Sequence, residues 1–496
     1  MRHFRPTLLA VLFAVVATLA RPAAARAAEW SALETDHFQV LSQVPEKTSR
    51  EIIRRLHIYM QALPKLTNLP VRPASVPTQV FLLEEASFER TRAGLSRVSG
   101  YFLPRTFRNI IVVDASKDLA TSLQIVQHEY VHFAIQNARL SSLPAFYEEG
   151  LAQFLESFTY RGQRFNWGYF PPGYQAIARS HVMSLPQLLA VEVGKGDYVD
   201  DNRKTPFYLR SLLLMHYCSI GQAGLREPFQ RLAARIADGD ATEEAFGGEF
   251  GISPKALDEK LDMYLVRGAE LRYMSLPAGD LDRDPGIRVF ALSAGEADVR
   301  FGNLLLETVP DDDGLVSLFS PHLENAGVRD LASVGLAMAY KQQGKPKEAD
   351  VELDRLAAMP DVSVAALITA GDVLFDRAHE DIDPDLLGNV LRRSASFYDA
   401  ALGKDPDSIE ALFGRGVVEI YLRDDLEGSL RRLIAAYPKS DQNADMALLL
   451  ALHFDLLGED EAARKIMQSA ACGAVSPRMQ ALVKEKLGAI RCYRSS

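Results

Sequence analysis

Two histidines separated by three residues lie on a stretch of strong helical periodicity. Apolar residues recur there every three or four positions, at Leu119, Leu123, Val126, Tyr130, Phe133 and Ala134. This spacing predicts a helix, with Asp114 or Ser116 available as its cap. On such a helix His128 and His132 project from one face and can bind one zinc ion, while Glu129 can reach a water on that ion. The alternative is a pair of core histidines with Glu129 in solvent.

A second helix is predicted directly after the first. Pro144 can begin it, and Phe146, Leu151, Phe154 and Leu155 give it an apolar side. Because the connection between the two helices is short, we expect the second to fold back against the first. That arrangement brings an early glutamate, Glu148 or Glu149, over the two histidines. Three protein ligands and one position left for water describe a catalytic zinc site, whereas a structural site has four protein ligands.

The segment 128–156 resembles the gluzincin zinc metallopeptidases, in their aminopeptidase-like and peptidase-MA-type branch. In that branch H-E-x-x-H is followed, about 16 to 20 residues later, by a segment of the form W-x-x-E-G-x-A. The counterpart here is Phe146-Tyr-Glu-Glu-Gly-Leu-Ala152, with 16 residues between His132 and Glu149. The resemblance implies Zn²⁺ held by His128, His132 and Glu149, with Glu129 as general base. Glu148 is the alternative third ligand, although it points about 100° away on the helix.

The same resemblance implies a tyrosine that stabilises the oxyanion. In many enzymes of the branch it opens a later helix, in a context like Y-x-K/R-G. Here Pro206-Phe-Tyr-Leu-Arg-Ser211 opens a helix predicted to run to about Cys218, so Tyr208 matches that tyrosine, and Ser211 departs from the glycine. The alternatives are the intervening residues Tyr160, Tyr169, Tyr174 and His181, or a Tyr208 that is simply packed in the core.

Further residues near the site are candidates for supporting roles. Gln153 and Glu156 follow Glu149 by four and seven residues, on the same helical face. Either could accept a hydrogen bond from a ligand imidazole and fix its tautomer. The strand predicted at Arg108–Val113, just before the zinc helix, is a natural edge for an extended substrate to pair with.

The N-terminus has the pattern of a secretory signal peptide. Arg2, His3 and Arg5 precede the apolar run 7–20, and Ala25-Arg26-Ala27 offers a cleavage site. The run is shorter than the roughly 20 residues of a membrane span, although an uncleaved anchor is the alternative. Residues 1–27 therefore predict a secreted or periplasmic protein with no transmembrane span in the mature chain.

Charge and cysteine content narrow the possible partners. The formal net charge of −10 supplies no positive field for nucleic acid, so no nucleic-acid partner is expected. Of the three cysteines, Cys472 and Cys492 could form a disulfide in an exported protein. Cys218 lies in an apolar run, where a buried thiol is expected.

The chain divides into two halves. Strands are predicted at 37–44, 79–83, 100–102 and 109–114, and a helix at 46–63. These belong to an α+β metallopeptidase domain at 28–276, a small mixed sheet followed by zinc-binding helices. Breaker residues predict a linker at 277–290. Tetratricopeptide-like helical repeats are predicted at 291–496 from the spacing of Ala337, Tyr340, Ala349, Leu353, Leu356, Tyr398, Ala401, Pro406, Gly414, Leu430, Leu433, Pro438, Ala462 and Ile466, with a degenerate unit starting near Ala294. The alternative for this half is a non-repeating helical bundle.

These features together predict an exported zinc-dependent peptidase. Glu129 would serve as general base and Tyr208 as oxyanion stabiliser, acting on a peptide or protein substrate. The repeats offer a surface for a protein partner. The competing hypothesis is a weak or inactive metallopeptidase-like protein that works through its repeats as a cell-envelope interaction or assembly factor.

Overall fold

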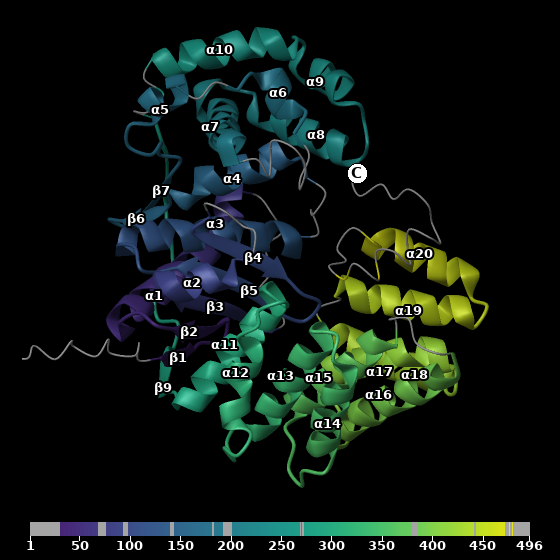
Figure 1. Cartoon of the computed structure of the whole chain (residues 1–496). Helices are drawn as coiled ribbons and strands as arrows, with labels where there is room; N and C mark the ends of the chain where they lie inside the picture. The colour runs from purple at the N-terminus through teal and green to yellow at the C-terminus, as the bar shows by residue number, and fades with distance from the viewer. Residues whose placement is uncertain are drawn as a thin grey trace, which may run out of the picture.

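The computed structural model describes residues 30–67, 76–92, 98–138, 143–180, 183–191, 201–267, 269, 272–378, 384–440, 443–471, 476 and 479 (Figure 1). The predicted signal peptide, His181, Cys472 and Cys492 lie outside the described residues. Within the described part, no helix is long and apolar enough to cross a membrane.

A six-stranded sheet forms the centre of the first half. Its order is β4-β5-β3-β2-β1-β9. The strands are β1 (Ser31–Glu34), β2 (Phe38–Ser42), β3 (Thr78–Leu83), β4 (Gly100–Pro104), β5 (Asn109–Asp114) and β9 (Arg288–Ala291). β2 and β5 each pair in parallel with β3, whereas β4, β1 and β9 are antiparallel to their neighbours. The predicted mixed sheet is confirmed, with all four predicted strands in it.

Both faces of this sheet are apolar. Along β3, Val80 and Leu82 belong to one hydrophobic core, and the alternating residues Phe81 and Leu83 belong to another. The first face packs on α1 (Glu46–Thr67) and α3 (Leu119–Asn137). The second packs on α2 (Glu85–Thr91) and on α11 (Ala294–Thr308), α12 (Leu315–Phe319) and α13 (Arg329–Gln342). A sheet of parallel central strands therefore has helices on both faces, as such sheets require.

The segment predicted as a linker connects two sheets. β8 (Met274–Pro277) pairs with β7 (Arg164–Trp167), which pairs with β6 (Thr159–Arg161) in a small antiparallel sheet. Residues 278–287 are irregular, and β9 then joins the large sheet beside β1. The second half of the chain therefore begins inside the first half's sheet, and its first three helices share a core with that sheet.

A helical layer lies on the far side of α3 from the sheet (Figure 1). It consists of α4 (Ala145–Glu156), α5 (Tyr174–Ser180), α6 (Leu185–Leu189), α7 (Asp201–His216), α8 (Arg226–Ala237), α9 (Thr242–Phe250) and α10 (Pro254–Val266). A π-helical turn at Tyr217–Gly221 extends α7 and contains Cys218, which is buried as expected. The helix predicted to open at Pro206 begins five residues earlier, at Asp201.

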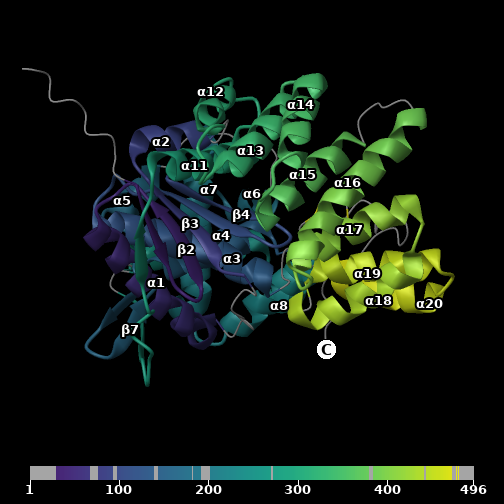
Figure 2. The ribbon, with the colours of Figure 1, turned by 90° about the horizontal axis from the view of Figure 1, so that it is seen from below.

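The second half continues as helix pairs. α13 pairs with α14 (Pro346–Ala357), α15 (Val364–Arg377) with α16 (Pro384–Lys404), α17 (Ile409–Leu422) with α18 (Leu426–Ala436), and α19 (Ala444–Leu456) with α20 (Asp460–Ala470). The first helices of successive pairs also pack on one another. Figure 2 shows this half curving away from the sheet. Tyr398 of α16 illustrates the packing, since a Cβ at Gly371 or Gly414 would lie within 2.8 Å of its ring. The predicted helical repeats are present.

The prediction that β5 offers a free edge to a substrate was wrong. β5 hydrogen-bonds to β3 on one side and to β4 on the other. The free edge of the sheet at this end is that of β4. The strands expected at 100–102 and 109–114 form a hairpin, in which β4 turns back at residues 105–108 and covers the edge of β5.

We expect a chain truncated after Ala291 to aggregate. Without α11–α13, the apolar residues on the second face of the sheet would be exposed to water: Leu41, Phe81, Leu83, Ile110 and Val112. Size-exclusion chromatography and binding of an apolar dye should show aggregation or exposed apolar surface for residues 28–291 but not for 28–496. A monomeric 28–291 fragment that unfolds cooperatively would contradict the shared core.

A second prediction concerns Asp372 of α15. Burial raises the pKa of this carboxyl to about 7, against the hydrogen bond from Tyr398 and the charge of Arg108. Because the folded-state pKa lies above the unfolded one, the folded state holds the proton more tightly, and stability falls as the pH rises from about 4 to 7. In Asp372→Asn this loss should disappear, a difference of at most about 4 kcal/mol at pH 8.

Urea unfolding at pH 5 and pH 8 measures the part of this difference, about 3 kcal/mol, that falls between those two pH values. Glu259→Gln provides the control, since Glu259 is an exposed carboxylate on α10. If Asp372→Asn and Glu259→Gln showed the same change between the two pH values, the carboxyl of Asp372 would not titrate as described.

Candidate metal centre

Helix α3 presents the two histidines away from the sheet. Its buried side chains include Val126, Tyr130 and Phe133 in the core formed with α1 and the sheet. The cap is Asp118, whose carboxylate accepts hydrogen bonds from the amides of Ala120 and Thr121. The predicted cap at Asp114 or Ser116 was therefore wrong, and Asp114 instead accepts hydrogen bonds from Ser116.

Helix α4 packs between α3 and α7 and carries the acidic residues. It begins after Pro144, as predicted. Gly150 lies where α4 meets α7, because a Cβ there would be 2.7 Å from the carbonyl oxygen of Ser211. The glycine after Glu149 thus allows the two helices to approach closely, which holds Glu149 and the α7 residue Tyr208 in one neighbourhood.

His128, His132 and Glu149 come together as a cluster that could hold a metal ion. Glu149 Oε2 lies 3.4 Å from His128 Nε2 and 3.8 Å from His132 Nε2. The Glu149 residue is only 4% exposed. Two ligand atoms each about 2.1 Å from a tetrahedral zinc lie about 3.4 Å apart, so these separations fit one ion with little adjustment.

A carboxylate contacts the Nδ1 atom of each imidazole, the ring nitrogen that does not face Glu149. Glu156 Oε2 lies 2.7 Å from His128 Nδ1, and Glu148 Oε1 lies 3.0 Å from His132 Nδ1. These contacts favour the proton on Nδ1 in a metal-loaded site, which leaves both Nε2 atoms as ligands facing Glu149. Glu148 therefore lies on the Nδ1 side of His132, whereas Glu149 lies close to the Nε2 atoms of both histidines. Carboxylates orienting metal-bound imidazoles recur in metalloproteins.

Gln153 is the supporting candidate that lies elsewhere. Its amide Nε2 donates to the carbonyl oxygens of Glu149 and Tyr208, at 3.3 and 3.0 Å. It therefore ties α4 to α7, and these hydrogen bonds go to backbone carbonyls and not to an imidazole. Helical spacing alone grouped Gln153 with Glu156, and it could not show that α7 covers one of them.

Glu129 is buried beside the cluster. Burial raises the pKa of its carboxyl, while the charges of His128 and His132 lower it. The first residue of β4 packs directly on it, since a Cβ at Gly100 would lie 3.4 Å from Glu129 Cγ and 2.3 Å from the Ile125 side chain. Sequence reasoning missed Gly100, whose role depends on a contact between distant segments.

Tyr208 lies within electrostatic reach of the acidic residues. Burial raises the pKa of its hydroxyl, and the nearby charges of Glu149, Glu129 and Glu156 raise it further. The alternative tyrosines have other neighbours. Tyr160 packs on Phe165, Tyr169 stacks on Tyr273, and the Tyr174 hydroxyl donates to the carbonyl oxygen of Leu209.

Without a metal, the neighbouring carboxylates favour the protonated form of both histidines. Burial lowers the pKa of His128, but Glu149 and Glu156 outweigh burial and raise it well above its ordinary value. The pKa of His132 also ends above its ordinary value, against burial, because of Glu149 and Glu148. A divalent cation between the Nε2 atoms would supply the same positive charge and leave the imidazoles neutral.

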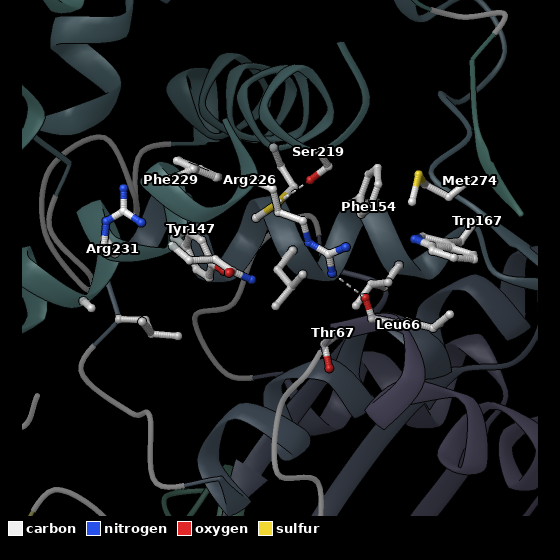
Figure 3. A pocket seen from close by; sticks show the side chains of 16 residues that line it. Leu66, Thr67, Tyr147, Phe154, Trp167, Ser219, Arg226, Phe229, Arg231 and Met274 are labelled. Atoms are coloured by element: carbon white, nitrogen blue, oxygen red, sulfur yellow. Dashed lines mark hydrogen bonds between the residues drawn. The ribbon is translucent and has the colours of Figure 1, made fainter. Parts of the chain in front are cut away.

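A cavity of about 400 Å³ lies along one side of α4 (Figure 3). Its walls include Tyr147, Leu151 and Phe154, the apolar side of α4, together with Trp167 and Phe229. The side chains of His128, His132 and Glu149 are not among its lining residues. The cavity is therefore a separate apolar space, and the acidic residues of α4 face α3 instead.

Comparison with known proteins gives little about function. No known family matches the sequence, and no curated protein matches it. Five solved chains match the structure. Among them is YrrB, described as a tetratricopeptide-repeat protein with an unusual peptide-binding site. It has 17% sequence identity and a TM-score of 0.29, over 38% of this chain and 91% of YrrB. A likeness this weak carries no argument, so the repeat architecture rests on the helix pairs themselves.

The carboxylates behind the histidines give a prediction about metal affinity. Glu156→Gln or Glu148→Gln should weaken zinc binding about 10- to 100-fold, because the imidazole they orient becomes a poorer ligand. Competition with a chromophoric chelator measures the affinity. The control is Glu259→Gln, an exposed carboxylate on α10. If all three variants matched the parent protein, neither carboxylate would support the metal.

Proposed function

We propose that this protein is an exported zinc-dependent peptidase of the gluzincin type, hydrolysing peptide bonds of a peptide or protein substrate. The observation that carries the proposal is the convergence of His128, His132 and Glu149 around one possible metal position, with Glu129 buried next to it. Two nitrogen ligands and one carboxylate leave a coordination position open, as in catalytic zinc sites.

The proposed chemistry assigns one step to each remaining group. When bound, zinc supplies a Lewis acid that polarises the scissile carbonyl and acidifies water. Glu129 removes a proton from the attacking water and delivers it to the leaving amine. The raised pKa of its buried carboxyl suits both halves of that transfer. Tyr208 remains protonated at neutral pH and donates a hydrogen bond to the oxyanion.

The buried Glu129 favours hydrolysis over another chemistry. Two histidines and one carboxylate also hold iron in oxygenases, so the ligand set alone leaves the reaction class open. A carboxylate beside the first histidine, within reach of the open position, is the feature that a hydrolase needs as its base.

The free edge of β4 supports an extended peptide as substrate. β4 is the last strand of the sheet and begins at Gly100, against Glu129. A peptide paired with this edge would run past the proposed metal position with its backbone hydrogen-bonded to β4.

The competing proposal is an inactive metallopeptidase-like protein that works through its repeats. The helix pairs are the observation that favours it, since stacked repeats commonly offer binding surfaces. The retention of all three ligands, the base and the two carboxylates behind the histidines favours an active site instead.

The decisive test is Glu129→Gln. This variant should keep its zinc, because Glu129 is not a ligand, and should lose hydrolysis by at least about 10²-fold. His128→Ala and Glu149→Ala should lose the zinc itself. Metal content by elemental analysis and digestion of a quenched peptide library measure the two properties. Full activity in Glu129→Gln, in a preparation whose His128→Ala form is inactive, would remove Glu129 as the base.

Tyr208→Phe tests the oxyanion role separately. The variant should keep zinc and a similar KM, with kcat lower by about 10²- to 10³-fold, because the lost hydrogen bond forms only in the transition state. Tyr273→Phe is the control, since Tyr273 is exposed and stacks on Tyr169. An unchanged kcat in Tyr208→Phe would leave the oxyanion without this partner.

A further inference from the structure

The turn between β4 and β5 lies against the repeat helices. We call residues 105–108 of this turn the hairpin tip. The Phe107 ring packs on Phe413 of α17, with ring centroids 5.1 Å apart. The Asn443 amide, at the start of α19, donates to the carbonyl oxygen of Thr106 at 2.6 Å. Two of the first helices of the repeat pairs therefore hold the tip from positions more than 300 residues along the chain.

Charge complementarity strengthens the contact. Arg105 Nε donates to Glu307 of α11 at 2.7 Å, and Arg108 lies 3.5 Å from the same carboxylate. Arg108 also acts electrostatically on Asp372 and Glu410, lowering the pKa of each carboxyl against the effect of burial. The repeats thus present carboxylates from α11, α15 and α17 to a basic tip.

The other end of the hairpin touches the proposed catalytic residues. Gly100, the first residue of β4, packs on Ile125 and Glu129 of α3. In the middle of β4, the Phe102 ring lies edge-on to Phe133 of α3, at 6.1 Å. β4 has a strand partner only on its β5 side among the described strands. Its position thus depends on α3 at one end and on the repeats at the other.

We propose that the repeat half holds the hairpin tip and so fixes the edge strand β4 in register beside the metal site, with Phe107 and Asn443 as positioning residues. This inference rests on the proposed peptidase function only for the role of β4 in substrate binding. A five-residue strand spans about 17 Å, so one end can be held without any contact between the repeats and the metal. On this proposal the repeats bind a segment of their own chain, the hairpin tip.

The physical reason for such a support lies in the free edge. A strand paired on one side has half of its backbone groups available, and an incoming peptide gains most when those groups are already in place. If β4 were loose, substrate binding would have to order the strand first. The free energy of that ordering would weaken binding. Because peptide and transition state would both pair with β4, the loss should appear in KM and little in kcat.

Two variants on the repeat side test the proposal without touching β4. Asn443→Asp keeps a side chain that caps α19, since Asn443 accepts from the Met446 amide, but it removes the donor to Thr106. Phe413→Ala removes the partner of Phe107. Tyr421→Ala is the control on the same helix, exposed and packed on Phe375 of α15.

We expect Asn443→Asp and Phe413→Ala to raise KM for an extended peptide about five- to tenfold, the equivalent of about one hydrogen bond, with kcat and zinc content little changed. Tyr421→Ala should match the parent protein. Amide hydrogen exchange of residues 100–103, measured by mass spectrometry, should accelerate in the two variants and not in the control.

The exchange measurement separates failure of this proposal from failure of the peptidase proposal. If β4 exchanged equally slowly in all forms, the repeats would not hold the strand, whatever the activity. If exchange accelerated but KM did not change in an active enzyme, β4 would not position the substrate. A parent protein without hydrolysis would overturn the peptidase proposal, and faster exchange in the two variants would still support the hold of the repeats on β4.

Discussion

The apolar character of both sheet faces determines how the whole chain is arranged. Val80 and Leu82 need cover from α1 and α3, while Phe81 and Leu83 need cover from α11–α13. Because the second cover comes from the start of the repeats, the two halves of the chain share one hydrophobic core. Docking those first helices directs the remaining pairs past the edge of the sheet, which brings α17 and α19 to the β4–β5 hairpin. The repeats and the proposed site are therefore parts of one framework.

Buried negative charge makes the His128, His132 and Glu149 cluster suited to a cation. Glu129, Glu148, Glu149 and Glu156 surround two imidazoles, and Glu129 and Glu149 are almost wholly removed from water. Burying carboxylates is costly unless positive charge compensates them. In the metal-free protein the pKa values of His128 and His132 rise, against the effect of burial, because the neighbouring carboxylates favour positive charge on the imidazoles. A metal ion at the Nε2 atoms would perform the same task and free the imidazoles to act as ligands.

Local patterns in the sequence were sufficient for much of this structure. The spacing of apolar residues predicted α3, α4 and the four strands, and the helical positions of His128 and His132 followed from that spacing. Contacts between distant segments could not be predicted in this way. Gly100 contacts Glu129 only because β4 packs on α3. The position of β4 at the end of the sheet depends on how the strands pair, which the spacing of apolar residues does not show. Likewise, β9 contributes only four residues to the sheet, too few for a pattern to distinguish it from the irregular segment before it.

Ser211, which stands where the gluzincin-like pattern has a glycine, lies at the crossing of α4 and α7. The close approach of these two helices depends on Gly150 of α4. Ser211 is fully buried, and its carbonyl oxygen would lie 2.7 Å from a Cβ at position 150. Tyr208 is one helical turn before Ser211, and Glu149 is the residue before Gly150, so a single crossing point sets the relation between the two functional side chains. Gln153 ties the same crossing together by donating to carbonyl oxygens on both helices. The serine on α7 is thus compatible with a Tyr208 close enough to Glu149, Glu129 and Glu156 for their charges to raise the pKa of its hydroxyl.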